Sequence, residues 1–404
     1  MAYAGVEPGE SGICLELGFV IISDFCAMSE KSIASNQVRI FGLVLVIILL
    51  TFPFWGIKTP SGILAAPIAG NHDLLYFATD APDNFIIYSP GLRANRQILP
   101  ASERMSDMVV SSDGTKVWAA SKAGFVDRFE IPVDRTAFGA STIRQKIAPV
   151  LGSIALSADE RFIAVGYGNS EDYNSRNVKI LPADTLNPLE ELADFSVSGD
   201  IQDIVANPVK DLFYIVNSHT DRVRIYNAGR FRLEPDIIEL GNSPGKFIVR
   251  PDGLRAYGSM NARKAVAVVD LETNKTTEYI SLDFPPYAMC FSEDGRHLYV
   301  ASRDSSSIVM IDTETDKINL AFDLPPRLPG LVESNFPEMI GISADENYMY
   351  VMPKRQELVV YDISPVREMG ARGKPKMLQA EPLATTPFAM DVIRGHIIPG
   401  VPEK

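Results

Sequence analysis

Short runs of apolar residues, interrupted by polar turns, recur along the chain from about residue 73 to its end. Each unit begins with an apolar strand that ends in a turn of the type Ser-x-Asp-Gly. A second strand rich in Tyr and Val follows, then a polar turn and a third strand in which apolar and polar positions alternate; Pro285 to Leu324 is the clearest copy. Alternation with period two, bounded by Gly, Asp and Asn, is typical of antiparallel β-strands. The pattern therefore predicts an all-β repeat.

The turns after the first strands set the length of the repeat. They fall at Asp113-Gly114, Asp159-Glu160, Val209-Lys210, Asp252-Gly253, Asp294-Gly295 and Asp345-Glu346. Successive turns are 46, 50, 43, 42 and 51 residues apart, which is about the length that four short strands and their tight turns require. The spacing predicts six continuous units of four strands each.

A seventh unit is split between the two ends of the repeat region. Leu75–Phe77 and Phe85–Tyr88 have the character of second and third strands without a first strand, whereas Pro387–Met390 has that of a first strand with nothing after it. Joining them closes a ring and leaves no unpaired strand edge inside it. We therefore expect a seven-bladed β-propeller with four-stranded blades over residues 72–397, closed by a C-terminal strand and followed by a tail at 398–404.

Several of these strands resemble the YVTN family of β-propeller repeats. The matching segments are Leu298–Ser302, Ile308–Asp312, Glu314–Lys317, Phe213–Asn217 and Val266–Asp270, and the resemblance covers roughly residues 72–395. It implies the propeller fold and says little about activity. Members of the family look like extracytoplasmic binding or surface-layer modules, and related propellers serve as subunits of quinoprotein dehydrogenases.

The N-terminal part of the chain has a different pattern. Residues 40–57 carry no charge and are numerous enough to cross a bilayer, so we expect one transmembrane or signal helix ahead of the propeller. It is either an uncleaved anchor or a signal peptide cut near Ala65–Ala69. Lys31 and Arg39 precede it and place residues 1–39 in the cytoplasm, with Met28 as an alternative start. Residues 58–71 are a linker, and the propeller is expected to face the periplasm or the cell exterior.

Charge and cysteine content narrow the classes of function. The net charge of −13 repels phosphate backbones and disfavours nucleic-acid binding. The three cysteines, Cys14, Cys26 and Cys290, form no CxxC or CxxCH motif, so the sequence offers no zinc ribbon or c-type haem attachment. No cofactor is predicted.

Two chemical motifs are better explained by the repeat than by catalysis. Residues 241–245 match G-x-S-x-G, but they lie between blades, whereas a nucleophile elbow requires a strand, a sharp turn and a helix. His219 and His297 fall on opposite faces of the expected ring, so they cannot bind the same metal ion. A zinc site would in any case need three or four ligands. Neither a catalytic residue nor a metal site is predicted.

Breaks in the repeat indicate a binding face. Two long insertions, at 168–177 and 325–339, fall on the face that carries the loops between second and third strands, and insertions on one face often mark the working surface. Aligning the units also places the mouth of the central channel on this face. The candidate binding residues are Asp107, Asp203, Lys246, Tyr287 and Glu338 at the mouth and Tyr173, Arg176 and Arg327 in the insertions.

The sequence thus favours a membrane-anchored extracytoplasmic propeller that is a binding or scaffold module for a protein or a small ligand, with a protein partner at or near the membrane. No enzymatic activity of its own is expected. The alternative is an enzyme: the propeller subunit of a quinoprotein or amine-dehydrogenase-like redox complex, or a lactonase-like hydrolase. The redox alternative needs another subunit to hold the cofactor, because the chain has no haem motif.

Overall fold

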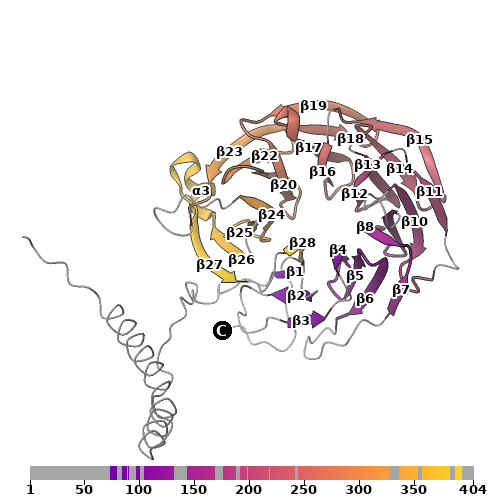
Figure 1. Ribbon diagram of the computed structural model, residues 1–404. Coiled ribbons are helices and arrows are strands. Elements are labelled where there is room, and N and C mark those ends of the chain that lie inside the picture. Colours follow the sequence, from indigo (N-terminus) through magenta and orange to yellow (C-terminus); the bar gives the residue numbers. More distant parts are fainter. Residues whose placement is uncertain are drawn as a thin grey trace, which may run out of the picture. The chain divides into compact units, whose positions relative to one another are not determined.

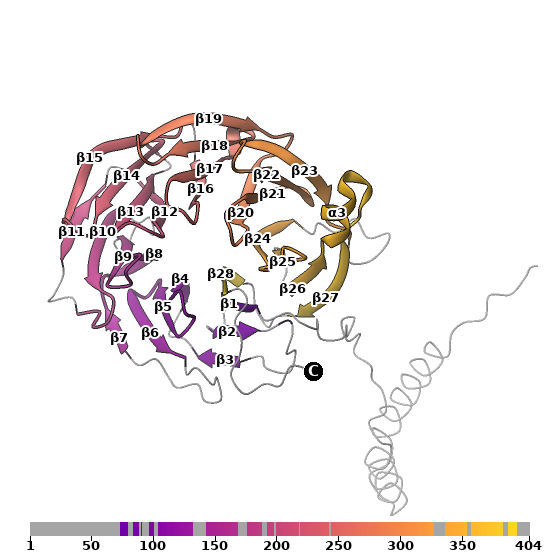
Figure 2. The ribbon, with the colours of Figure 1, turned by 180° about the vertical axis from the view of Figure 1, so that it is seen from behind.

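The computed structural model describes residues 73–393, apart from 80–83, 89, 91–96, 101–103, 132–142, 169–175, 188–191, 198, 218, 242–243, 327–335, 354–356 and 383–386. They belong to one compact unit, Gly62–Lys404. Its strands form radial sheets around a central axis (Figure 1), and the same ring is seen from behind in Figure 2.

The unit contains seven antiparallel four-stranded sheets. Six are built from consecutive strands: β4 (Met105–Val110), β5 (Lys116–Ser121), β6 (Phe125–Glu130), β7 (Ile143–Lys146); β8 (Val150–Leu156), β9 (Phe162–Gly168), β10 (Asn177–Pro182), β11 (Ala193–Ser196); β12 (Ile201–Ala206), β13 (Leu212–Asn217), β14 (Arg222–Asn227), β15 (Arg232–Glu239); β16 (Pro244–Val249), β17 (Arg255–Met260), β18 (Ala265–Asp270), β19 (Lys275–Ser281); β20 (Pro286–Phe291), β21 (His297–Ser302), β22 (Ser307–Asp312), β23 (Lys317–Asp323); β24 (Pro337–Ile342), β25 (Tyr348–Pro353), β26 (Glu357–Asp362), β27 (Lys376–Pro382). The seventh joins β28 (Pro387–Ile393) to β1 (Leu74–Thr79), β2 (Asn84–Tyr88) and β3 (Gln97–Pro100). The described helices are short: η2 (Asn261–Arg263), α3 (Ser364–Met369) and η3 (Gly370–Arg372).

The ring closes where the two ends of the repeat region meet. Strand β28 pairs antiparallel with β1, with Met390 opposite Phe77 and Val392 opposite Leu75. The first strands contact one another in the order β4, β8, β12, β16, β20, β24, β28, and β28 contacts β4 in turn. The split sheet therefore takes a place between β24 and β4, and no first strand is left at an open end.

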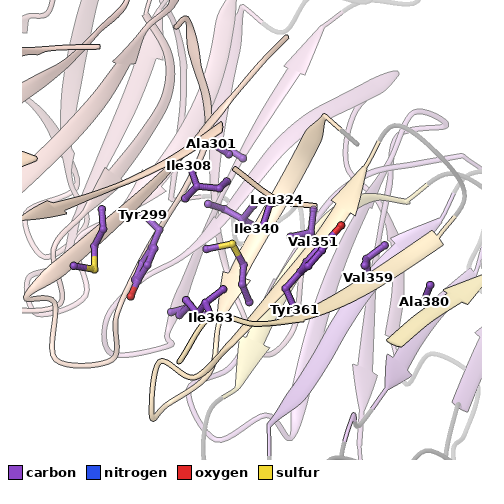
Figure 3. Close-up of a cluster of buried hydrophobic side chains, with 14 residues drawn as sticks. Tyr299, Ala301, Ile308, Leu324, Ile340, Val351, Val359, Tyr361, Ile363 and Ala380 are labelled. Atoms are coloured by element: carbon purple, nitrogen blue, oxygen red, sulfur yellow. The ribbon is translucent and has the colours of Figure 1, made fainter. Parts of the chain in front are cut away.

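Apolar side chains fill the space between neighbouring sheets. Figure 3 shows one such cluster, in which Tyr299, Ala301 and Ile308 of one blade pack against residues of the next. Strands β21 and β25 are buried along almost their whole length, because each is covered by a neighbouring sheet on both faces. At about 25 cal/mol per Å² of apolar area, packing between blades is the principal stabilising contribution.

The Ser-x-Asp-Gly turns have a recurring hydrogen-bond pattern. The Ser292 hydroxyl donates to Asp294 Oδ1 (2.7 Å), and the same oxygen accepts the N–H of Arg296 at 3.0 Å. The N–H of His297 in turn donates to Ser292 Oγ at 3.0 Å. Gly295 has φ +71°, a conformation that glycine adopts without steric cost. Serine, aspartate and glycine are thus the residues that this tight turn between the first and second strands requires.

The sequence-based fold needs one correction, in its N-terminal part. The expected transmembrane or signal helix is not part of the described structure: none of the helices found between residues 73 and 393 is long and apolar enough to cross a membrane. The apolar run at 40–57 lies outside the described residues. Hydropathy alone led to that expectation.

Candidate functional site

A bulge interrupts the pairing of the first strand with the second in every blade. The register shifts lie between Met105 and Asp107, Leu151 and Ile154, Ile201 and Asp203, Pro244 and Phe247, Pro286 and Met289, Pro337 and Met339, and at Ala78/Thr79 opposite β28. A bulge leaves a residue unpaired and changes the direction of nearby side chains. The rim residues chosen from the sequence fall in or beside these bulges.

Asp107 lies directly after the bulge of β4. Its Oδ1 accepts the N–H of Met108 at 2.9 Å, and its Oδ2 accepts the N–H of Ile154, on first strand β8 of the next blade, at 3.1 Å. The two bonds fix the plane of the carboxylate. Ser106, the unpaired residue, donates its hydroxyl to the carbonyl of Gly152 at 2.9 Å. The bulge thus links two blades and positions Asp107 between them.

Asp203 and Lys246 form an ion pair across the boundary between the blades of β12 and β16. Lys246 Nζ lies 3.4 Å from Asp203 Oδ2, while Asp203 Oδ1 accepts the N–H of Ile204 at 3.1 Å. The side chain of Asp203 is 12% exposed and that of Lys246 is 58% exposed. The backbone N–H of Lys246 donates to Ser259 Oγ at 2.8 Å, which anchors its strand end. The ammonium group therefore remains accessible while its carboxylate partner is covered.

Electrostatic coupling joins these residues into what we call the axial cluster: Asp107, Asp203 and Lys246. Partial burial raises the pKa of Asp107 to about 6; attraction to Lys246 opposes this rise and repulsion from Asp203 adds to it. Attraction to Asp203, and secondarily to Asp107, raises the pKa of Lys246 above its ordinary value. Asp107, Asp203 and Lys246 lie on the first strands β4, β12 and β16, with β8 between the first two, so the cluster extends over four neighbouring blades.

Tyr287 and Glu338 extend the rim beyond the cluster. The Tyr287 phenolate, when ionised, is the last and smallest of the charges that raise the pKa of Lys246, and the Arg303 guanidinium lies 5.4 Å from the centroid of the Tyr287 ring. Glu338 occupies the bulge of β24, but no hydrogen bond or ion pair among the described residues connects it to the cluster. The structure thus joins four of the five predicted rim residues.

The predicted loop residues are only partly described. Arg176 forms an ion pair with Asp200, with Nε 2.9 Å from Oδ1. Tyr173 and Arg327 lie outside the described residues, so their prediction stays untested. Sequence reasoning missed Asp200, although it stands three residues before Asp203; its pairing with Arg176, from another blade, depends on the ring. Within the described segments, no group of three or more His, Cys, Asp or Glu residues could hold a metal ion.

Comparisons with known proteins identify the fold. No family model and no curated protein matches the chain, so the YVTN resemblance is supported only as a β-propeller. Among solved structures, the chain is similar to the periplasmic gluconolactonase of Pseudomonas aeruginosa (TM-score 0.62, 18% identity, 81% of this chain and 99% of that one). It is also similar to the hydrazine synthase of Kuenenia stuttgartiensis (0.58, 15%, 70% and 88%) and to the dihydro-heme d1 dehydrogenase NirN (0.54, 16%, 81% and 76%).

Proposed function

We propose that the chain hydrolyses a cyclic ester, a lactone, bound over the axial cluster. The observation that carries the proposal is the contrast between two carboxylates in one cluster. Asp107 has a pKa raised to about 6, whereas Asp203 is paired with the ammonium of Lys246. A carboxylic acid whose pKa is raised toward neutrality, close to a charged ammonium group, is typical of acid–base catalysis.

The geometry suggests a division of roles. The Asp107 carboxylate accepts a proton from a water molecule as that water attacks the lactone carbonyl carbon. The accessible ammonium of Lys246 stabilises the negative charge that develops on the carbonyl oxygen. The ring C–O bond then breaks, and its oxygen takes a proton and leaves as a hydroxyl, which gives the hydroxy acid. The raised pKa keeps Lys246 charged, which suits a charge stabiliser and disfavours a nucleophilic amine.

The structural comparisons support this class of activity over the first interpretation from the sequence. One similar propeller is named a gluconolactonase, and the others are named a synthase and a dehydrogenase. At these identities the likeness shows the fold alone, so the axial cluster has to carry the chemistry. Binding of a protein partner through the same face stays a prediction, since Tyr173 and Arg327 lie outside the described residues.

The test is a lactone-hydrolysis assay on the purified protein, following proton release with glucono-1,5-lactone and unsubstituted lactones. Replacing Asp107 by Asn should lower kcat by about 10²–10⁴-fold, the range of a general base. The control is Glu314→Gln, which removes an exposed carboxylate (67% exposed) on the opposite face. Absence of lactonase activity in the wild-type protein, or full activity of the Asp107→Asn variant, would rule out this function.

A further inference from the structure

A second group of charged side chains stands on the same face as the axial cluster. Asp200 Oδ1 accepts the Nε–H of Arg176 at 2.9 Å, and Asp200 Oδ2 lies 3.5 Å from Nδ1 of His219. Asp200 is 17% exposed, whereas the side chain of His219 is 67% exposed. The carboxylate is therefore held between two partners, and most of the His219 side chain is open to solvent.

The backbone around His219 is fixed. The buried side chain of Asn217 accepts the N–H groups of His219 and Thr220 through Oδ1, at 3.1 and 3.0 Å. Gly199, with φ +90°, packs so closely that an added Cβ would lie 2.8 Å from Asn217 Oδ1 and 3.0 Å from the Cβ of His219. The two loops interlock, which positions an otherwise exposed imidazole against Asp200.

The register of the blade places this pair at the end of the sheet that carries Asp203. Asp200 immediately precedes β12, and Ile201 pairs with Asn217 at the end of the sheet. Asp203 pairs with Val216, one step further along the same strand and beyond the bulge. The residue before β12 and the turn after β13 thus form a histidine–aspartate pair at one end of the blade that carries Asp203.

We propose that His219 is the proton donor to the departing ring oxygen, which rests on the proposed function. Histidine changes charge between pH 5 and 8 and exchanges protons readily. As the ring C–O bond breaks, protonated His219 gives the Nε2 proton to the oxygen, while Asp107 keeps the proton taken from water. Asp107 then releases its proton to solvent, and His219 takes one up, which restores both residues. Asp200 and Arg176 are positioning residues, because Asp200 lies 3.5 Å from Nδ1 of the imidazole and Arg176 holds the Asp200 carboxylate.

The experiment compares two esters whose leaving groups differ in their need for a proton. An alkoxide leaving from an aliphatic lactone needs a proton, whereas p-nitrophenolate, leaving from p-nitrophenyl acetate, does not. His219→Gln should lower kcat for the lactone by about 10²-fold and leave p-nitrophenyl acetate hydrolysis within about threefold, since general acid catalysis matters only for poor leaving groups. Asp200→Asn should act in the same direction with a smaller loss. Free imidazole should restore lactone hydrolysis to a His219→Ala variant.

The matched control is His297→Gln, which breaks another histidine–carboxylate contact, His297 Nδ1 to Glu346 Oε2 at 2.9 Å, on the opposite face. It should leave the ratio of the two activities unchanged. If His219→Gln loses the same factor in kcat for the lactone and for p-nitrophenyl acetate, or loses none for either, His219 is not the proton donor. The proposed function survives that result as long as the wild-type protein hydrolyses lactones. A wild-type protein that hydrolyses no lactone overturns the proposed function, and the role of His219 with it.

Discussion

Replacing Asp107 by Asn should change how the stability of the fold depends on pH. The carboxylate accepts N–H groups from Met108 and Ile154 through its two oxygens. An amide retains one acceptor and places an NH₂ group against the other N–H, which is a cost that does not vary with pH. The informative quantity is therefore the difference in the free energy of unfolding between variant and wild type, measured as a function of pH.

The sign and size follow from the pKa of Asp107, which burial raises from 3.8 to about 6 in the folded protein. The folded state binds more protons than the unfolded state between these values, so stability contributed by the protonated carboxyl is present below about pH 4 and is lost as pH rises through about 6. At about 1.4 kcal/mol per pKa unit, the loss is on the order of 1–3 kcal/mol. The Asn variant has no such loss, so its free energy of unfolding relative to that of the wild type rises by that amount as pH increases from about 4 to above 6.

Urea unfolding of both proteins at several pH values between about 4 and 8 measures this difference. A difference that changes between about pH 4 and 6 and levels off above about 6 supports the reasoning, and Glu314→Gln provides the baseline for a surface carboxylate. A difference that stays flat across this range would show that Asp107 has an ordinary pKa. The assignment of Asp107 as the base would then lose its electrostatic support.

Three further predictions concern the fold and its location. Glu346 has φ +55° at a turn position where Gly114, Gly253 and Gly295 stand in other blades, and its carboxylate accepts the Tyr299 hydroxyl at 2.6 Å. Glu346→Gly should lower the free energy of unfolding by about 1–2 kcal/mol, because the buried Tyr299 hydroxyl loses its partner. Relief of backbone strain at this position offsets part of the loss. Thermal unfolding should show a smaller effect for Glu160→Gly, because the Glu160 carboxylate accepts its hydrogen bonds from Ser112 at an exposed position; equal effects would contradict this. Deletion of 385–404 removes β28 and should cost several kcal/mol by exposing apolar side chains, so a melting temperature within a few degrees of the parent would disprove closure by this strand. A reporter fused after Lys404 should be active only outside the cytoplasm, and cytoplasmic activity would contradict the expected location.

The residues at the channel mouth show what repeat alignment can predict and what it cannot. Counting back from each turn selected Asp107, Asp203, Lys246 and Tyr287, which the structure brings into electrostatic contact. It selected Glu338 by the same rule, although no hydrogen bond or ion pair within the described residues links that side chain to the others. Alignment gives a position in each blade, and only the distances between blades decide which positions act together.

The sequence by itself determined the strands, their turns and the pairing of the two chain ends. Alternation of apolar residues and the Ser-x-Asp-Gly turns depend on neighbours within a few residues, and a ring of sheets needs its last strand to pair with its first. Only the tertiary structure decided that Asp200 joins Arg176 to His219, that Asp107 accepts an N–H from Ile154, and that partial burial raises the Asp107 pKa. The Arg176–Asp200 and Ile154–Asp107 contacts cross blade boundaries, and burial and charge act through space, so these residues, 24 and 47 positions apart, meet only once the sheets have assembled into the ring.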